Sequence, residues 1–188
     1  FRSKVRYVGE AIAAVAAEDL LTAKEALKKI KVRYRQLVAI TKTEDAIKPG
    51  AVIIHDDVPD NIVMHIPIRK GNVDKGMAEA DFVIEETYYT QPVEHAYLEP
   101  EAGLAYLDAD GTLVIQSPSQ NITHHRQKLA KILDMPVNRV RMIMSPVGGG
   151  FGGKEDMHYQ GILALAVLKC RRPVRYVFTR EEDRKSVV

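Results

Sequence analysis

The residues best suited to chemistry lie in a glycine-rich run at positions 148–155, which reads GGGFGGKE. Five of the twelve glycines in the chain fall within six consecutive positions of this run. Glycine has no side chain to pack and loses much conformational entropy when ordered, so packing does not explain the run. Glycines instead allow positive φ angles and a close approach of backbone N–H donors to a ligand. We therefore expect residues 148–155 to form part of a ligand-binding site.

Two phosphate-binding patterns overlap this run, and neither fits it completely. Gly148, Gly153 and Lys154 match the start of G-x-x-x-x-G-K-[ST]. However, Glu155 stands where a hydroxyl should bind magnesium, and its carboxylate would repel a triphosphate. Gly148, Gly150 and Gly153 also satisfy the G-x-G-x-x-G pattern of NAD and FAD sites, but no convincing ribose-binding acid follows about 20 residues later. A nucleotide (NAD or FAD) binding module stays open as an alternative function.

Composition excludes several classes of function. The chain has 188 residues, of which 46% are hydrophobic, and its formal net charge is +2. Its basic residues are largely dispersed, which argues against nucleic-acid binding. The single cysteine, Cys170, excludes an internal disulfide and any all-cysteine zinc or iron–sulfur site. No apolar run approaches the roughly 20 residues of a membrane span, so we expect no membrane role. Phe1 is not a natural start, so we expect a piece of a larger protein.

The elements that must position the glycine run begin with a predicted β-α-β unit over residues 1–40. Residues 5–17 and 32–34 have strand character, and the segment between them has apolar residues at helical spacing. Asp19 or Thr22 is the expected cap of that helix.

An irregular connector is predicted next, because residues 41–72 contain several proline and glycine breakers. We place the domain boundary near Gly71, which gives one domain at 1–70 and a second at 71–188.

The second domain is predicted to alternate short helices and strands. Asp110-Gly111, between two alternating apolar runs, predicts a hairpin. Asn121 is the expected cap of a helix that buries Ile122, Leu129, Ile132 and Leu133. The predicted helices lie at 73–80, 121–133 and 157–168, and the predicted strands at 82–90, 103–107, 112–116, 140–144 and 174–178. The expected fold class is α+β, with mixed sheets and packed helices.

Three further segments accompany the glycine run in a fixed order. They read QPVEHAYLEP at 91–100, PSQ at 118–120 and PVNRV at 136–140. With GGGFGGKE, this set closely resembles the molybdenum-binding subunit of the xanthine dehydrogenase/aldehyde oxidase family of molybdenum hydroxylases. The resemblance spans essentially the whole chain, yet the chain covers only a minor part of such a subunit. It implies that 1–70 is the C-terminal part of an α/β hammerhead domain plus a connector. Residues 71–188 are then the N-terminal part of a molybdopterin-binding domain.

The resemblance assigns roles to individual residues. It implies that the Gln120 side-chain amide donates a hydrogen bond to an oxo ligand of molybdenum. Gly150, Phe151 and Gly152 are expected to bind the cofactor through backbone N–H groups, so Gln120 and Phe151 lie beside the metal without coordinating it. Glu155 matches the position of a substrate-binding glutamate in xanthine-oxidising members, although it can also stabilise a helix dipole or pair with Lys154. His95 and Glu99 are implied to be scaffold and receive no chemistry.

The implied activity is oxidation of a carbon in a purine-like N-heterocycle or an aldehyde, with oxygen derived from water. The implied cofactor is molybdenum–molybdopterin, with its cytosine dinucleotide form left open, and FAD and 2Fe-2S centres are expected on other domains or subunits. The partners are the rest of the molybdenum subunit, these redox subunits and a small-molecule substrate, in the cytoplasm. No catalytic residue is expected in these 188 residues, so the isolated piece should be inactive. A non-catalytic assembly module remains a second alternative.

Overall fold

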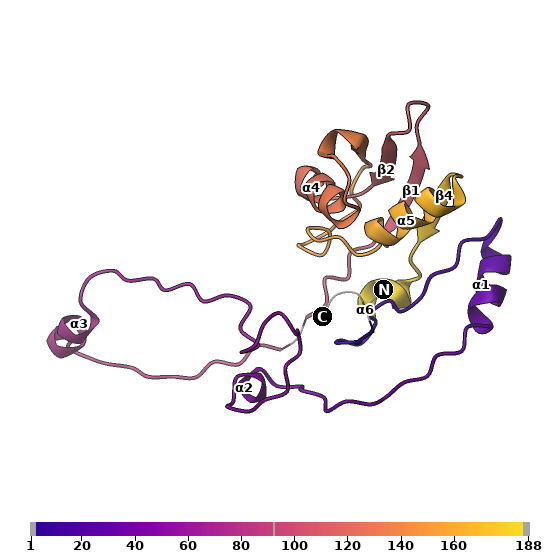
Figure 1. Ribbon diagram of the computed structural model, residues 1–188. Helices are drawn as coiled ribbons and strands as arrows, with labels where there is room; N and C mark the ends of the chain where they lie inside the picture. Colours follow the sequence, from indigo (N-terminus) through magenta and orange to yellow (C-terminus); the bar gives the residue numbers. More distant parts are fainter. Residues whose placement is uncertain (1–2, 92, 186–188) are drawn as a thin grey trace. The chain divides into compact units, whose positions relative to one another are not determined.

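Figure 1 shows a computed structural model of the chain, which describes residues 3–91 and 93–185. The chain divides into two compact units. One contains the residues up to 31 together with those from 93 onward, and the segment between them forms the other. The division into domains at 1–70 and 71–188 remains a prediction. The helices and strands confirm the α+β class: α1 (Leu20–Lys28), α2 (Thr43–Ala46), α3 (Val73–Glu79), β1 (Ala102–Leu107), β2 (Leu113–Ser117), α4 (Ile122–Ile132), η1 (Val137–Arg139), β3 (Val140–Met144), α5 (Gln160–Cys170), β4 (Val174–Val177) and α6 (Arg180–Lys185).

A four-stranded mixed sheet, in the order β3-β2-β1-β4, organises the larger unit. β1 pairs antiparallel with β2 and with β4, whereas β2 and β3 run parallel, with Ser117 opposite Met144 at their carboxyl ends. The predicted Asp-Gly hairpin joins β1 and β2. Gly111 takes a φ of 79° there, and the N–H of Asp108 donates to the carbonyl of Thr112 at 2.9 Å.

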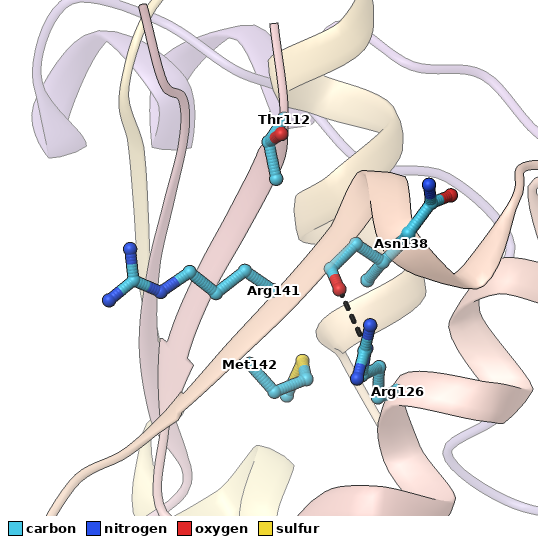
Figure 2. Close-up of a pocket in the computed structure, with 6 residues that line it drawn as sticks. Thr112, Arg126, Asn138, Arg141 and Met142 are labelled. Carbon is cyan, nitrogen blue, oxygen red and sulfur yellow. Dashed lines mark hydrogen bonds between the residues drawn. The ribbon is translucent and has the colours of Figure 1, made fainter. Parts of the chain in front are cut away.

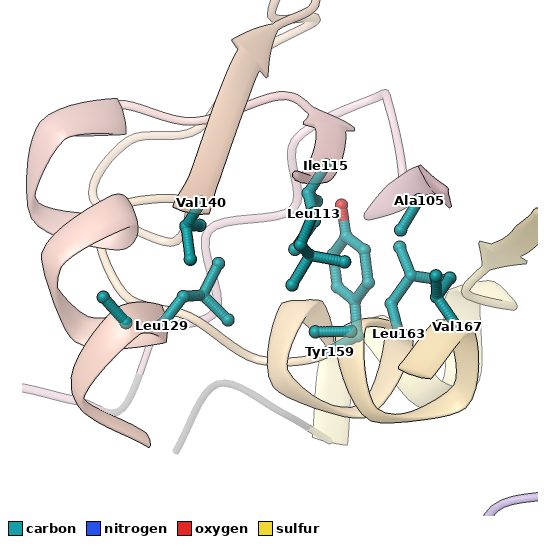
Figure 3. Packing of buried hydrophobic residues seen from close by; sticks show 10 residues of the cluster. Ala105, Leu113, Ile115, Leu129, Val140, Tyr159, Leu163 and Val167 are labelled. Carbon is teal, nitrogen blue, oxygen red and sulfur yellow. The ribbon is translucent and has the colours of Figure 1, made fainter. Parts of the chain in front are cut away.

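The hydrophobic core lies between this sheet and helices α4 and α5 (Figure 3). Its members include Ala105, Leu113, Ile115, Leu129, Val140, Tyr159, Leu163 and Val167, and each is at most 2% exposed. Full burial of a leucine or valine side chain stabilises the fold by about 1.5–3 kcal/mol. The core therefore fixes the sheet against both helices and holds the loops at the strand ends in place.

Helix α4 begins where the sequence predicts, but it buries a different face. The side chain of Asn121 caps it by accepting from the N–H of His124 at 3.2 Å. The buried residues are His125, Leu129 and Ala130, whereas Ile132, expected in the core, is 61% exposed. Leu129 and Ala130 join the hydrophobic core, whereas His125 on the same face contacts Ser119 and the carbonyl of Glu155.

Three predicted strands do not form in the described residues. Segments 5–17, 32–34 and 82–90 contain no strand pairing, so the β-α-β unit over 1–40 is wrong apart from its helix. A strand is stable only when a neighbour completes its hydrogen-bond ladder, and side chains such as Ile84, which is 86% exposed, bury little apolar surface here. The local signals identified helices α1 and α3, although the short helices α2 and α6 were not predicted. α1 starts after Asp19, which accepts from Thr22, and α3 confirms the helix predicted at 73–80.

Candidate active-site loop

The parallel pairing of β2 and β3 brings two distant segments to one end of the sheet. Gln120 follows the end of β2, and the glycine run follows the end of β3. The ladder continues past both strands, because the N–H of Ser145 donates to the carbonyl of Ser117 at 3.2 Å. Ligands of open sheets commonly bind at the carboxyl ends of parallel strands. The fold therefore places the predicted site residues where a ligand site is expected.

The side chain of Gln120 binds the glycine loop, which we define as residues 148–154. Its Oε1 accepts from the N–H of Gly152 at 3.0 Å and from the N–H of Lys154 at 3.2 Å. Its backbone N–H donates to the carbonyl of Lys154 at 3.0 Å. Two donors at one oxygen fix which way the amide points. Within the described ranges, Nε2 of Gln120 makes no hydrogen bond, so it is available as a donor.

The glycine loop adopts a conformation that only small residues accept easily. Gly149 and Gly152 have φ angles of 97° and 96°, and Phe151 between them has a φ of 52°. A Cβ atom added to Gly150 would lie 2.5 Å from Oε1 of Gln120. The N–H groups of Gly149, Gly150 and Phe151 have no hydrogen-bond acceptor within the described part of the chain. The loop therefore contains three successive N–H groups without an acceptor in that part of the chain, of which that of Gly150 belongs to a buried residue and that of Phe151 to an exposed one.

A buried lysine forms an ion pair with a partly exposed glutamate next to the glycine loop. The side chain of Lys154 is 0% exposed, and its Nζ lies 2.5 Å from Oε2 of Glu99 and 4.7 Å from the ring centre of Tyr97. The same Oε2 accepts from the N–H of Gly148 at 2.8 Å. Burial opposes ionisation of Glu99, but the hydrogen bonds from Lys154 and Gly148 outweigh it and hold the pKa of Glu99 below its ordinary value. Sequence reasoning missed this pair, because it placed Glu99 in the scaffold and Lys154 beside Glu155.

A second group of buried polar residues adjoins this pair. Asp183 accepts from the hydroxyl of Tyr97 at 3.1 Å and from the N–H of Glu101 at 3.2 Å, and its other oxygen pairs with Arg180 at 2.9 Å. The carboxyl oxygens of Glu101, by contrast, find no partner among the described residues. Burial raises the pKa of Glu101 to about 8. At neutral pH Glu101 is therefore mainly protonated, which avoids an unpaired buried charge.

The backbone of Glu155 is fixed by a histidine, while its carboxylate stays exposed. Nε2 of His125 lies 2.8 Å from the carbonyl oxygen of Glu155, so Nε2 carries the proton. Nδ1 is then the acceptor for the hydroxyl of Ser119, at 3.1 Å. Burial lowers the pKa of His125 and favours this neutral form. The Glu155 carboxylate lies 3.5 Å from the amide of Asn121 and faces solvent at the edge of the loop.

A hollow of about 310 Å³ lies elsewhere in the larger unit, and Figure 2 shows the residues that line it. Its lining residues are Thr112, Arg126, Asn138, Val140, Arg141 and Met142. They lie near the amino ends of β2 and β3, whereas the glycine loop follows the carboxyl end of β3. The guanidinium of Arg126 is already used, because it donates to the carbonyls of Val137 and Val140 at 2.9 Å each. This hollow contains none of the predicted site residues.

Two other features of the described residues bear on function. No three histidine, cysteine, aspartate or glutamate side chains there are grouped so that they could hold a metal ion. None of the helices found there has the length and apolar character needed to cross a membrane.

Comparison with known proteins tests the resemblance independently. A probable xanthine dehydrogenase subunit of Bacillus subtilis is 40% identical over 97% of this chain, which spans 24% of that protein. The nicotinate dehydrogenase large molybdopterin subunit of Eubacterium barkeri is 38% identical over 96% of the chain and 42% of its own length. The solved aldehyde oxidoreductase of Desulfovibrio gigas superposes with a TM-score of 0.82 at 25% identity, covering 89% of this chain and 18% of that one.

The chain therefore spans less than half the length of these two relatives. The sequence model of the molybdopterin cofactor-binding domain matches residues 54–187, which include the whole glycine loop and Gln120. With more than half of its residues matched, the chain belongs to the family of molybdopterin cofactor-binding domains.

Proposed function

We propose that this chain supplies the Gln120 and glycine-loop contacts to the molybdenum–pterin cofactor of a molybdenum hydroxylase. The observation that carries the proposal is the orientation of the Gln120 amide. Its oxygen is held by two loop N–H groups, so its NH₂ group points away as a donor. When bound, the cofactor supplies the oxidative chemistry that inserts water-derived oxygen into a carbon–hydrogen bond of the substrate.

The polarity of the loop fits such a cofactor. Oxo, dithiolene and phosphate groups accept hydrogen bonds, and the site offers donors: the Gln120 NH₂ group and the unused N–H groups of Gly149, Gly150 and Phe151. A side chain at Gly150 would collide with Gln120, so glycine at this position lets the loop lie directly against the amide. Donors fixed before reaction stabilise developing negative charge without reorganising.

Phe151 has a separate proposed role. Its side chain is 74% exposed, although a phenylalanine gains stability by burial. Its position among the glycines makes it the one large apolar side chain of the loop. We propose that it lies against the cofactor and excludes water from that side.

Glu155 is the proposed contact to substrate. Its exposed carboxylate accepts hydrogen bonds, which suits the ring N–H groups of an N-heterocycle better than an aldehyde. The names of two relatives, one a probable xanthine dehydrogenase and the other a nicotinate dehydrogenase, also refer to N-heterocycles. An aldehyde is the second proposed substrate class, because a protein of similar structure is named an aldehyde oxidoreductase.

The remaining machinery is proposed to lie outside these residues. It comprises the general base, the rest of the molybdenum subunit, and the FAD and 2Fe-2S domains or subunits. The cytosine dinucleotide form of the pterin and a cytoplasmic location also remain predictions. A nucleotide-binding module is not favoured, because α5 begins only at Gln160, so no helix amino end meets the glycines as dinucleotide binding requires.

The test uses the full-length subunit purified with its partner subunits. Molybdenum is measured by mass spectrometry, and hydroxylation is assayed with a purine, nicotinate and an aldehyde. Replacing Gln120 by alanine removes one donor and the acceptor that holds the loop, so we expect kcat to fall by about 10- to 100-fold. Gln116→Ala, an exposed glutamine on β2 without a loop contact, is the matched control. Absence of molybdenum from the wild-type protein would favour the assembly-module alternative.

A further inference from the structure

We infer that Glu99 and Lys154 act together as positioning residues for the glycine loop, an inference that rests on the proposed function. We call this pair the Glu99–Lys154 clamp. One carboxylate oxygen, Oε2 of Glu99, receives hydrogen bonds from both ends of the loop. The N–H of Gly148 donates at 2.8 Å and the ammonium of Lys154 at 2.5 Å. A single anchor therefore closes the loop at its base.

The buried charge of Lys154 makes the Glu99 carboxylate difficult to substitute. Its ammonium is completely buried, and a buried cation is tolerated only when it is paired and hydrogen-bonded. Glu99 provides both a carboxylate oxygen and a backbone carbonyl, the latter at 3.1 Å, and the ring of Tyr97 covers another side. Loss of the carboxylate would leave this charge without its counterion, directly beneath the loop.

The glycine loop also packs closely against the segment 97–99. A Cβ atom on Gly148 would lie 2.6 Å from Cβ of Glu99, and one on Gly153 would lie 2.7 Å from the ring of Tyr97. The loop therefore packs closely against residues 97–99, and the side chain of Gln120 accepts hydrogen bonds from it. The unused N–H donors of residues 149–151 lie between these two attachments. Their direction depends on the clamp, although neither clamp residue is needed to touch the cofactor.

Three variants of the full-length enzyme test this inference. Glu99→Gln removes the charge and keeps the shape, and Lys154→Met keeps much of the buried volume. The double variant Glu99→Gln/Lys154→Met leaves no unpaired buried charge, so it remains informative if either single variant fails to fold. Asp110→Asn is the matched control, because Asp110 pairs with Arg139 at 3.7 Å on the hairpin, away from the loop.

Two measurements besides activity distinguish positioning from general stability. Hydrogen–deuterium exchange of residues 148–154 should rise in the double variant, while exchange of β2 and β3 stays at the wild-type level. Molybdenum content should fall by about tenfold or more. Where metal is retained, kcat should fall more than KM rises, because misdirected donors weaken the transition state more than the bound substrate.

The outcomes separate this inference from the proposed function. A wild-type enzyme that contains no molybdenum contradicts the proposed function, and loop exchange in the double variant still decides whether the clamp holds the loop. A metal-containing wild type together with a double variant of unchanged loop exchange, metal content and kcat would overturn the clamp and leave the proposed function standing.

Discussion

Single residues in the glycine run have different physical reasons to be glycine. Gly149 and Gly152 need positive φ angles, Gly150 must leave room for Gln120, and Gly148 and Gly153 pack against the segment 97–99. From the sequence alone we expect the run to contact a ligand, on the ground that packing does not explain so many glycines together. The structure corrects that ground, because close packing does require three of them, Gly148, Gly150 and Gly153. The sequence does not predict the Glu99–Lys154 clamp, since its members are separated by 55 positions and complete burial of a lysine leaves no local signal.

Glu101 provides a prediction at this scale, because its carboxyl group is buried without a hydrogen-bond partner among the described residues. Its pKa in the folded chain is raised from 4.5 to about 8. The protonated form is therefore favoured on folding. The resulting stability is fully present below pH 4.5 and is lost as the pH rises toward about 8.

Replacing Glu101 by glutamine keeps the neutral, protonated shape at every pH. We expect the variant to match the wild type at low pH and to become more stable than it between pH 4.5 and about 8. The difference should grow by at most about 1.4 kcal/mol per pH unit. Urea unfolding at a series of pH values, followed by circular dichroism, measures it. Parallel stability curves for the two proteins would contradict a buried, protonated Glu101.

At the scale of elements, the parallel pairing of β2 and β3 assembles the proposed site. It brings Gln120 and the glycine loop, about 30 positions apart, to the same sheet end. The four strands and the helices α4 and α5 were predictable, because each completes a ladder or packs on the core within this chain, whereas η1 and α6 were not predicted. The strands expected at 5–17, 32–34 and 82–90 carry similar local patterns but find no neighbouring strand among the described residues. Local pattern therefore predicts strand character, whereas the presence of a partner decides whether a strand forms.

The contact between β1 and α5 gives the prediction at this scale. A Cβ atom on Gly103 would lie 2.7 Å from the ring of Tyr159 and 3.2 Å from Leu163. Gly103→Ala should therefore destabilise the fold by about 1–3 kcal/mol through overpacking. Gly161, on α5 itself, has open space around it, so Gly161→Ala should be neutral or stabilising by up to about 1 kcal/mol. Denaturant unfolding compares the two, and equal effects would show that β1 and α5 are not closely packed.

For the whole molecule, the proposed role of the described residues is to provide hydrogen-bond donors for a cofactor rather than ligands for a metal. They present the Gln120 amide and the loop N–H groups, and no metal-binding group of histidine, cysteine or carboxylate side chains occurs among them. Donors of this kind orient a cofactor, but each contributes a modest free energy when it replaces a hydrogen bond to water. Tight retention must then come from many more contacts, and this chain spans only 24% of the Bacillus subtilis relative.

We therefore predict that the 188-residue chain alone retains far less than one molybdenum per molecule, whereas the full-length subunit retains close to one. The reason is that a few hydrogen-bond donors at one loop contribute too little binding free energy to offset the loss of translational and rotational freedom on binding. Mass spectrometry of both proteins, expressed in the same host and desalted identically, provides the comparison. Circular dichroism of the short chain should show its helices, so that low metal content is not due to unfolding. Near-stoichiometric metal on the short chain would mean that the glycine loop and Gln120 bind the cofactor almost unaided.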